Sequence, residues 1–250
     1  MEKSIDKGHI HPMSQFISRA NAIFAEMGFS LVDGPELETE YYNFDALNVP
    51  KDHPARDMQD TFWVKQAETE KERKLLRTQT SAMQIRYMQG KQPPFKMVCV
   101  GKVYRNEATD ATHEMTFYQM ECLMINKNVT MVDLKSTINT FFDKFFERDV
   151  NVRFRPSFFP FTEPSLEADI SCFKCNGGEK GCPICKGTGW VEVGGAGMVH
   201  PKVLNGVGVN SNEWQGFAFG FGVDRIIMLK YGIDDIRFVY SGDLRFVNQF

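Results

Sequence analysis

The sequence predicts an α+β fold in which helices flank one antiparallel sheet, and three observations lead to this prediction. Amphipathic helices, with apolar residues at three- and four-residue steps, are indicated near residues 11–28 and 131–149. Most expected strands follow one another without a helix between them, which is typical of antiparallel sheets and not of doubly wound parallel ones. With 250 residues, 22 phenylalanines and a hydrophobic fraction of 42%, the chain can bury a large core.

The first half of the chain begins with a helix that has Pro12 in its first turn and Gly28 at its end. Residues 36–63 are mixed, and they are rich in aromatic and acidic residues. The other elements expected here are a strand at 29–32, a turn at 33–35, a charged solvated loop at 66–74, a strand at 75–80 and a helix at 81–89.

In the second half of the chain, the elements are expected from apolar runs and from the glycines between them. They are strands near 98–104 and 116–125, a helix at 131–149, strands at 152–158, 166–170 and 190–193, a Gly-rich turn, a helix from about residue 201, and a strand that runs into a helix over 216–230. No internal repeat, linker or low-complexity tail interrupts this order, so we expect residues 1–250 to form a single domain.

The hairpin formed by residues 98–125 carries the most informative pattern. Its first strand ends near Arg105 and Glu107, and its second strand places Phe117, Gln119 and Glu121 on one face. The other face alternates apolar residues, which packing alone explains. An arginine, an aromatic ring, an amide and a carboxylate side by side indicate instead a site for a nucleotide and a zwitterion.

Each charged residue of this site also has a simpler interpretation. Arg105 can fork onto a phosphate or pair with Glu107. Arg225, in the first turn of a helix after a Gly-rich strand, can bind an anion there or pair with Asp224. His113 lies in the polar loop, where a lone histidine is usually a hydrogen-bonding loop residue.

Aromatic residues give a second ambiguous signal. Phe117 can stack on a base or belong to the core. Phe159 and Phe161 flank Pro160 and face one way, so they can line a slot for a flat apolar side chain or fill the core.

Four of the six cysteines form two CxxC pairs within residues 171–189. These are Cys172, Cys175, Cys182 and Cys185. Two converging pairs of thiolates complete a closed tetrahedral shell, so the pattern predicts a structural zinc knuckle inserted between two strands. Disulfides or a rubredoxin-like iron are the alternatives. Cys99 and Cys122 lie within expected strands, as small buried residues do.

Composition excludes several classes of protein. No apolar run is long enough for a transmembrane helix, and the polar N-terminus has no signal-peptide core. The formal net charge of −3 is unlike that of a domain that binds nucleic acid alone. We therefore expect a cytoplasmic protein without a membrane partner.

Together these motifs resemble the three motifs of class II aminoacyl-tRNA synthetases. The order is helix, strand and Gly-Pro35, then Tyr104–Glu107 with its hairpin, then Gly220–Arg225. Within the class the chain resembles the alpha subunits of phenylalanyl-tRNA synthetases. The segments that carry this likeness are Gly8–Met13, Asp52–Met58, Leu76–Ser81, Thr109–Glu114, Phe159–Pro164 and Gly194–Pro201.

The resemblance implies roles for individual residues. Arg105 and Arg225 would be the catalytic cations, on the α- and γ-phosphates of ATP. Glu107 and His113 would contact the nucleotide, and Phe117 would stack on adenine. The phenylalanine substrate would be held by Gln79, Ser81, Gln119, Glu121, Phe159, Phe161, Ala218 and Gly220.

The resemblance also implies partners: L-phenylalanine, ATP with Mg²⁺, tRNA(Phe), and a beta subunit in a heterotetramer, or a homodimer if the chain is isolated. Glu163 would be a magnesium ligand shared with the partner subunit.

Three departures from the family pattern stand out. The N-terminal helical hairpin that contacts tRNA is expected to be absent, Gln79 replaces a common histidine, and the four-Cys insertion, expected to be structural only, occupies a short connector.

Alternative interpretations are a non-charging homologue, a zinc-ribbon RNA-binding module, or a synthetase for another amino acid such as phosphoserine. Arg105 and Arg225 together disfavour the first, the weak net charge the second, and Phe159, Phe161 and Ala218 the third.

Overall fold

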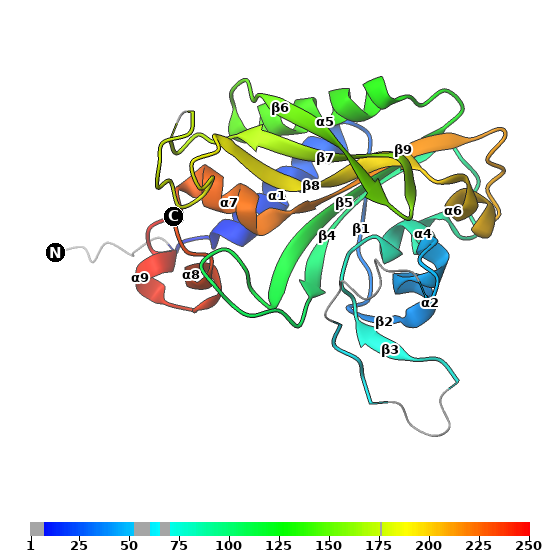
Figure 1. Ribbon diagram of the computed structural model, residues 1–250, viewed down its shortest axis with the longest axis horizontal. Helices are drawn as coiled ribbons and strands as arrows, with labels where there is room; N and C mark the ends of the chain where they lie inside the picture. Colours follow the sequence, from blue (N-terminus) through cyan, green and yellow to red (C-terminus); the bar gives the residue numbers. More distant parts are fainter. Residues whose placement is uncertain (1–7, 53–60, 66–70, 176) are drawn as a thin grey trace.

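A computed structural model describes residues 8–52, 61–65, 71–175 and 177–250. Its centre is a seven-stranded sheet with the order β1-β4-β5-β9-β8-β7-β6 (Figure 1). The strands are β1 (Ser30–Val32), β4 (Phe95–Tyr104), β5 (Thr116–Asn126), β6 (Val152–Phe159), β7 (Thr162–Ser171), β8 (Trp190–Val199) and β9 (Gln215–Gly222). All neighbours pair antiparallel except β1 and β4. The sheet is therefore mixed at one edge, which corrects the expectation of a purely antiparallel one.

Three helices cover one face of the sheet: α1 (Pro12–Glu26), α5 (Met131–Phe146) and α7 (Val223–Tyr231). Local sequence sets their ends. Pro12 occupies the first turn of α1, Thr130 and Asp133 form a capping box at α5, and Gly232 ends α7 with a left-handed backbone. The phenylalanines of α1 and α5 pack here against those of β9, so they belong to the core.

The opposite face of the sheet carries a smaller apolar cluster and the polar residues of β5. The elements around it are β2 (Leu37–Thr39), β3 (Lys74–Leu76), α2 (Glu40–Asn43), the short 3₁₀ turn η1 (Asp45–Leu47), α4 (Ala82–Met88) and α6 (Pro201–Gly206). Figure 1 shows α2, α4 and the β2–β3 pair gathered at the lower right. Two short helices, α8 (Arg237–Tyr240) and α9 (Leu244–Val247), end the chain at the left.

The Gly-rich segment after residue 193 is not the turn that the sequence predicted. It continues β8 to Val199, because glycines are needed there for close strand packing. A Cβ on Gly194 would lie 2.1 Å from the backbone oxygen of Gly220, and one on Gly197 would lie 2.6 Å from the oxygen of Pro164. These two glycines therefore allow the backbones of β7, β8 and β9 to approach closely.

Most other predicted elements are confirmed within a few residues, while two groups of short elements were missed. The short elements β2, α2 and η1 lie in the mixed region 36–63, and α8 and α9 in the unassigned C-terminal stretch. Residues 53–58 of the segment Asp52–Met58 and most of the charged loop at 66–74 lie outside the described residues. Within the described chain, no helix combines the length and apolarity needed to cross a bilayer.

Candidate functional site

The main cavity opens on the face of the sheet opposite α1 and α5, and has a volume of about 620 Å³. Its floor comes from β5, β8 and β9, and its sides from the loop 105–114 and the segment 158–162. This volume is typical of sites that enclose a small molecule. All residues assigned to nucleotide or phenylalanine binding from the sequence line it, as do Glu167, Glu192 and Asp224.

Glu121 is the most buried charged group of the cavity, and four side chains donate hydrogen bonds to it. Ser81 and Thr80 donate to its Oε2 from 3.0 Å, and so does Gln119. Gln84 donates to Oε1. Burial raises the pKa of the Glu121 carboxyl to about 7, while the four hydrogen bonds oppose that rise. The residue is thus a carboxylate held in place but poorly solvated, which suits the binding of a cation.

Arg105 follows the last residue of β4 and, like Arg225, brings a cation to the lining of the cavity. Its guanidinium carbon lies 5.0 Å from the centroid of the Phe117 ring, and its Nη1 lies 4.0 Å from Oε1 of Glu107. Burial lowers the pKa of the Arg105 guanidinium, which nevertheless stays charged. The ion pair with Glu107 therefore exists, but at the limit of contact, and Nε of Arg105 donates to the backbone oxygen of Thr78 at 3.4 Å.

Arg225 does not pair with Asp224, the alternative that the sequence left open. Tyr240 donates a 2.7 Å hydrogen bond to Oδ1 of Asp224, and burial raises the pKa of that carboxyl to about 7. Arg225 points elsewhere, and its Nη1 donates to the backbone oxygen of Glu192 at 3.3 Å. Successive residues on a helix point about 100° apart, so the side chains of Asp224 and Arg225 contact different parts of the protein.

His113 adopts the loop role that a lone histidine usually has, and it also borders the cavity. Its Nδ1 lies 3.0 Å from Oδ1 of Asp110. The backbone N–H of Thr112 and the His113 ring lower the pKa of Asp110. These contacts stabilise the bend of the loop 105–114 at the edge of the cavity.

An aromatic wall faces the floor of the cavity. The rings of Phe159 and Phe161 stack with their centroids 6.0 Å apart and their planes 23° apart. Gly195 lies directly under the Phe159 ring, which a Cβ there would meet at 2.6 Å. Opposite, Ala218 and Gly220 on β9 present almost no side chain. The wall and floor therefore bound an apolar slot in the cavity, and Glu121 lies beside it, paired with Gly220 on the neighbouring strand.

Gln79 and Glu163 differ from the other predicted residues in what they contact. Gln79 is buried at the cavity and donates to the backbone oxygen of Asn43 at 3.1 Å, so its amide is already engaged. Glu163 does not line the cavity; its side chain is 75% exposed, and its Oε2 lies 3.3 Å from Nε2 of His200. An exposed carboxylate of this kind is available to a partner surface, not to the interior of the cavity.

Sequence reasoning missed Thr80, Gln84, Glu167 and Glu192, all of which line the cavity or hold a residue that does. Glu167 and Glu192 lie within 4.0 Å of Arg155, which also meets Asp169. Alternation along β7 and β8 could have placed these acids on the polar face. Thr80 carried no local signal, because its partner lies 41 residues further along the chain.

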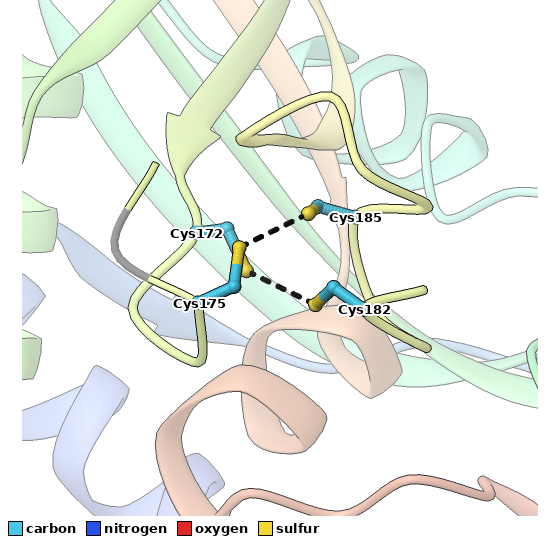
Figure 2. A group of neighbouring side chains, drawn as sticks. All are labelled: Cys172, Cys175, Cys182 and Cys185. Atoms are coloured by element: carbon cyan, nitrogen blue, oxygen red, sulfur yellow. Dashed lines mark hydrogen bonds between the residues drawn. The ribbon is translucent and has the colours of Figure 1, made fainter. Parts of the chain in front are cut away.

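The four-Cys loop links β7 to β8, and its sulfur atoms converge (Figure 2). One potential ligand atom from each of Cys172, Cys175, Cys182 and Cys185 lies within 4.8 Å of the others. The Sγ atoms of Cys172 and Cys182 are 3.9 Å apart, and those of Cys175 and Cys185 are 3.4 Å apart. Four thiolates bound to one zinc at about 2.3 Å would be separated by about 3.8 Å, so the set fits the ion.

Backbone amides support the charge of this cluster. Gly178 donates its N–H to Sγ of Cys175 at 3.3 Å, and amides of this turn lower the pKa of the Cys175 thiol to about 6. The loop also packs on the core, where the Phe173 ring meets Phe146 at a centroid distance of 5.0 Å. These contacts are typical of a metal-stapled loop and not of a pair of reactive thiols.

Comparison with known proteins gives the same family throughout. The family described as tRNA synthetases class II core domain (F) matches residues 1–250. A phenylalanine–tRNA ligase alpha subunit of Clostridium perfringens is 55% identical over 243 residues, which cover 97% of this chain and 69% of that protein. The alpha subunits of Bacillus cytotoxicus and Bacillus cereus are each 53% identical over 250 residues, or 99% of this chain and 70% of theirs.

The fold, the lining of the cavity and the comparisons with relatives all point to one family. The sheet order, the carboxylate and guanidinium in one cavity, and a match along the whole chain have one common explanation. The chain belongs to the class II tRNA synthetases, among the alpha subunits of phenylalanine–tRNA ligases.

Proposed function

We propose that this chain activates L-phenylalanine with ATP and transfers the phenylalanyl group to tRNA(Phe), as the catalytic subunit of a phenylalanine–tRNA ligase. One observation carries the assignment of the site. A buried carboxylate, Glu121, and a partly buried guanidinium, Arg105, line a single cavity together with an apolar slot. An amino acid presents an ammonium and a ring, and ATP presents phosphates, so the cavity matches both substrates at once.

The amino acid binds with its ammonium at Glu121, within reach of Gln119 and Ser81, which already donate to that carboxylate. Gln79 supports this end of the cavity from its buried position. The substrate ring enters the slot and meets the aromatic wall of Phe159 and Phe161. Ala218 and Gly220 close the slot without a polar group, so a para hydroxyl finds no partner there.

ATP binds along the other half of the cavity. Arg105 holds the α-phosphate, and the neighbouring Phe117 ring stacks on adenine, with Arg225 on its other side. Glu107 and His113 contact the nucleotide from the loop that both occupy. Arg225 also reaches the γ-phosphate, at the first turn of α7, where the helix dipole favours an anion.

The chemistry needs no nucleophile from the protein. A carboxylate oxygen of phenylalanine attacks the α-phosphorus, a new P–O bond forms, and the bond to the β-phosphate oxygen breaks to release pyrophosphate. Arg105 stabilises the charge that builds on the α-phosphate oxygens, and the slot fixes the attacking carboxylate. A terminal tRNA hydroxyl then attacks the carbonyl carbon, and AMP leaves.

Magnesium would accompany ATP and neutralise part of its phosphate charge. Glu163 lies outside the cavity on an exposed edge. We therefore assign it a magnesium site shared with a partner subunit, separate from the reacting phosphates.

Residues 1–250 then form one catalytic domain, with residues 171–189 as a zinc knuckle inserted between β7 and β8. Its four thiolates leave no coordination position for a substrate, so zinc is structural. The assembly would be a cytoplasmic heterotetramer with a beta subunit, or a homodimer when the chain is isolated.

Phenylalanine-dependent exchange of pyrophosphate into ATP tests this function directly. The assay is run on the chain alone and then with a beta subunit added, with tyrosine in place of phenylalanine as the control. Exchange that depends on phenylalanine and is much weaker with tyrosine is the expected result. No exchange in either preparation, or equal exchange with both amino acids, contradicts the proposal.

A further inference from the structure

A second cavity of about 300 Å³ lies beside the first, and the zinc knuckle forms part of its wall. The knuckle contributes Ile184, Cys185, Lys186 and Thr188. Three residues, Thr112, Glu192 and Arg225, line both cavities. The knuckle is therefore close to the main cavity, because the cavity that it lines shares these three residues with the main one.

The charge of this second cavity is positive. Arg225 and Lys186 are its two cations, and Glu192 is the one acid among the described residues that line it. The Glu192 carboxylate is partly neutralised, because its Oε2 lies 3.6 Å from Nη2 of Arg155. No described carboxylate forms an ion pair with Lys186, whose side chain is exposed. A polyanion that reaches past Arg225 would meet this second cation.

The backbone holds Lys186 in that position. Its N–H donates to the backbone oxygen of Cys182 at 2.9 Å, inside the turn that carries the second CxxC pair. The next hydrogen bond of the turn runs from Thr188 N–H to Cys185 O, at 3.0 Å. A turn tied in this way presents the lysine from a fixed point, while its long side chain remains free to follow a phosphate.

We propose that Lys186 is a further substrate-binding residue, which contacts the pyrophosphate portion of ATP together with Arg225. This inference rests on the proposed function, in which Arg225 meets the phosphates beyond the α-phosphorus. The knuckle then has a second task besides the stability expected of it, because it brings one cation to the leaving group. Lysine acts there as a point charge on a flexible stem, as is usual for phosphate ligands.

The test compares Lys186→Gln, which removes the charge but keeps the length, with Lys186→Arg, which restores a cation. Lys180→Gln is the matched control, since Lys180 is exposed on the same knuckle and lines neither cavity. The holoenzyme is assayed for the KM values of ATP, pyrophosphate and phenylalanine in the exchange reaction. A non-hydrolysable sulfamoyl analogue of phenylalanyl-adenylate, which lacks the two outer phosphates, is the second probe.

Lys186→Gln should raise the KM of pyrophosphate and of ATP about fivefold, the scale of one exposed cation on a phosphate. The KM of phenylalanine and the inhibition constant of the analogue should stay at the parent values, and so should the melting temperature and zinc content. Lys186→Arg and Lys180→Gln should behave like the parent. An unchanged KM for pyrophosphate, or an equal loss of affinity for the analogue, overturns the inference.

Failure of the proposed function would look different. In that case the parent protein shows no phenylalanine-dependent exchange, whatever stands at position 186. Calorimetric titration with inorganic pyrophosphate then tests the site without the reaction. Weaker binding by Lys186→Gln than by Lys180→Gln supports the site, and equal binding overturns it.

Discussion

The hydroxyl of Ser81 donates a 3.0 Å hydrogen bond to Oε2 of Glu121, although 40 residues separate them in the chain. Ser81 immediately precedes α4, whereas Glu121 lies in the middle of β5. The contact fixes one lone pair of a carboxylate that would otherwise be costly to bury. It also aims that carboxylate into the cavity, and the amino-acid half of the site depends on this arrangement.

Replacing Glu121 with glutamine should weaken phenylalanine binding specifically. The amide has nearly the same shape but no charge, so the substrate ammonium loses a charge-assisted hydrogen bond of about 1.5–3 kcal/mol. The KM of phenylalanine should rise about 10- to 100-fold, while that of ATP changes less than about twofold. Glu213→Gln, at an exposed site bonded to Asn210, is the control. An unchanged KM for phenylalanine in exchange assays would refute the assignment.

The raised pKa of Glu121, about 7, predicts a pH dependence of phenylalanine binding. The ammonium of the substrate needs the ionised carboxylate, so the KM of phenylalanine should fall as pH rises from about 6 to about 8. The slope should approach tenfold per pH unit below the pKa and vanish above it. In Glu121→Gln this dependence should disappear, and a parent profile that is flat over the range would contradict the assignment.

Stability of the free protein should change in the opposite sense. Because the folded pKa exceeds the ordinary value of 4.5, the folded state binds more protons between about 4.5 and 7. The stability that Glu121 contributes to the folded state is fully present below pH 4.5 and is lost as the pH rises to about 7. Asp224 acts in the same direction, so the part due to Glu121 is the difference between the parent and Glu121→Gln. Melting temperatures across the window measure it.

Alternation along one strand was enough to find the polar face of β5, because Phe117, Gln119 and Glu121 all line the cavity. The partners of Glu121 could not be found in the same way. Thr80 and Gln84 come from around α4, and only the packing of that helix against the sheet brings them within hydrogen-bond distance. Local patterns carry no information on such long-range pairs.

Glycine was the least reliable local signal. The run after residue 193 has the composition of a turn, yet Gly194 and Gly197 serve close strand contacts within the sheet. The parallel edge was also missed, since Ser30–Val32 pairs with a strand that begins 65 residues after it. In both places the deciding contacts lie in another part of the chain, and nearby residues cannot reveal them.

Ala218→Gly should widen the apolar slot and admit para-substituted phenylalanines. Ala218 is 2% exposed, and its methyl group lies at the cavity on β9. We expect exchange with para-chlorophenylalanine to rise well above the parent level, at a cost in stability of about 0.5–1 kcal/mol for glycine in a strand. Ala168→Gly, buried in β7 within the core on the helical face, should lower stability without changing specificity. Exchange with the chloro analogue at the parent level contradicts the prediction.

Gly220→Ala should disturb the same site by adding a methyl group instead of removing one. The added Cβ would lie 2.7 Å from Nε2 of Gln119 and 3.0 Å from Oε2 of Glu121, so both side chains must move. The KM of phenylalanine should rise about tenfold or more, because the head-group ligands lose their mutual hydrogen bond. Gly206→Ala meets nothing within 4 Å and should leave the KM unchanged. Parent-like kinetics of Gly220→Ala in the exchange assay would show that these ligands are not used.

Removing the proposed zinc should distinguish the two roles that we propose for the knuckle, stability and the placement of Lys186. Cys185→Ser, or a chelator, should lower the zinc content and reduce the melting temperature by about 5 °C or more, because the loop has little core of its own. Cys99→Ser, outside the cluster, should keep the zinc.

Well below the melting temperature, the KM of phenylalanine should stay near the parent value, since Glu121 and its donors do not touch the knuckle. The KM of pyrophosphate should rise, because a slackened turn no longer holds Lys186 beside Arg225. A loss of phenylalanine binding at unchanged stability would instead mean that the zinc loop acts on the whole cavity.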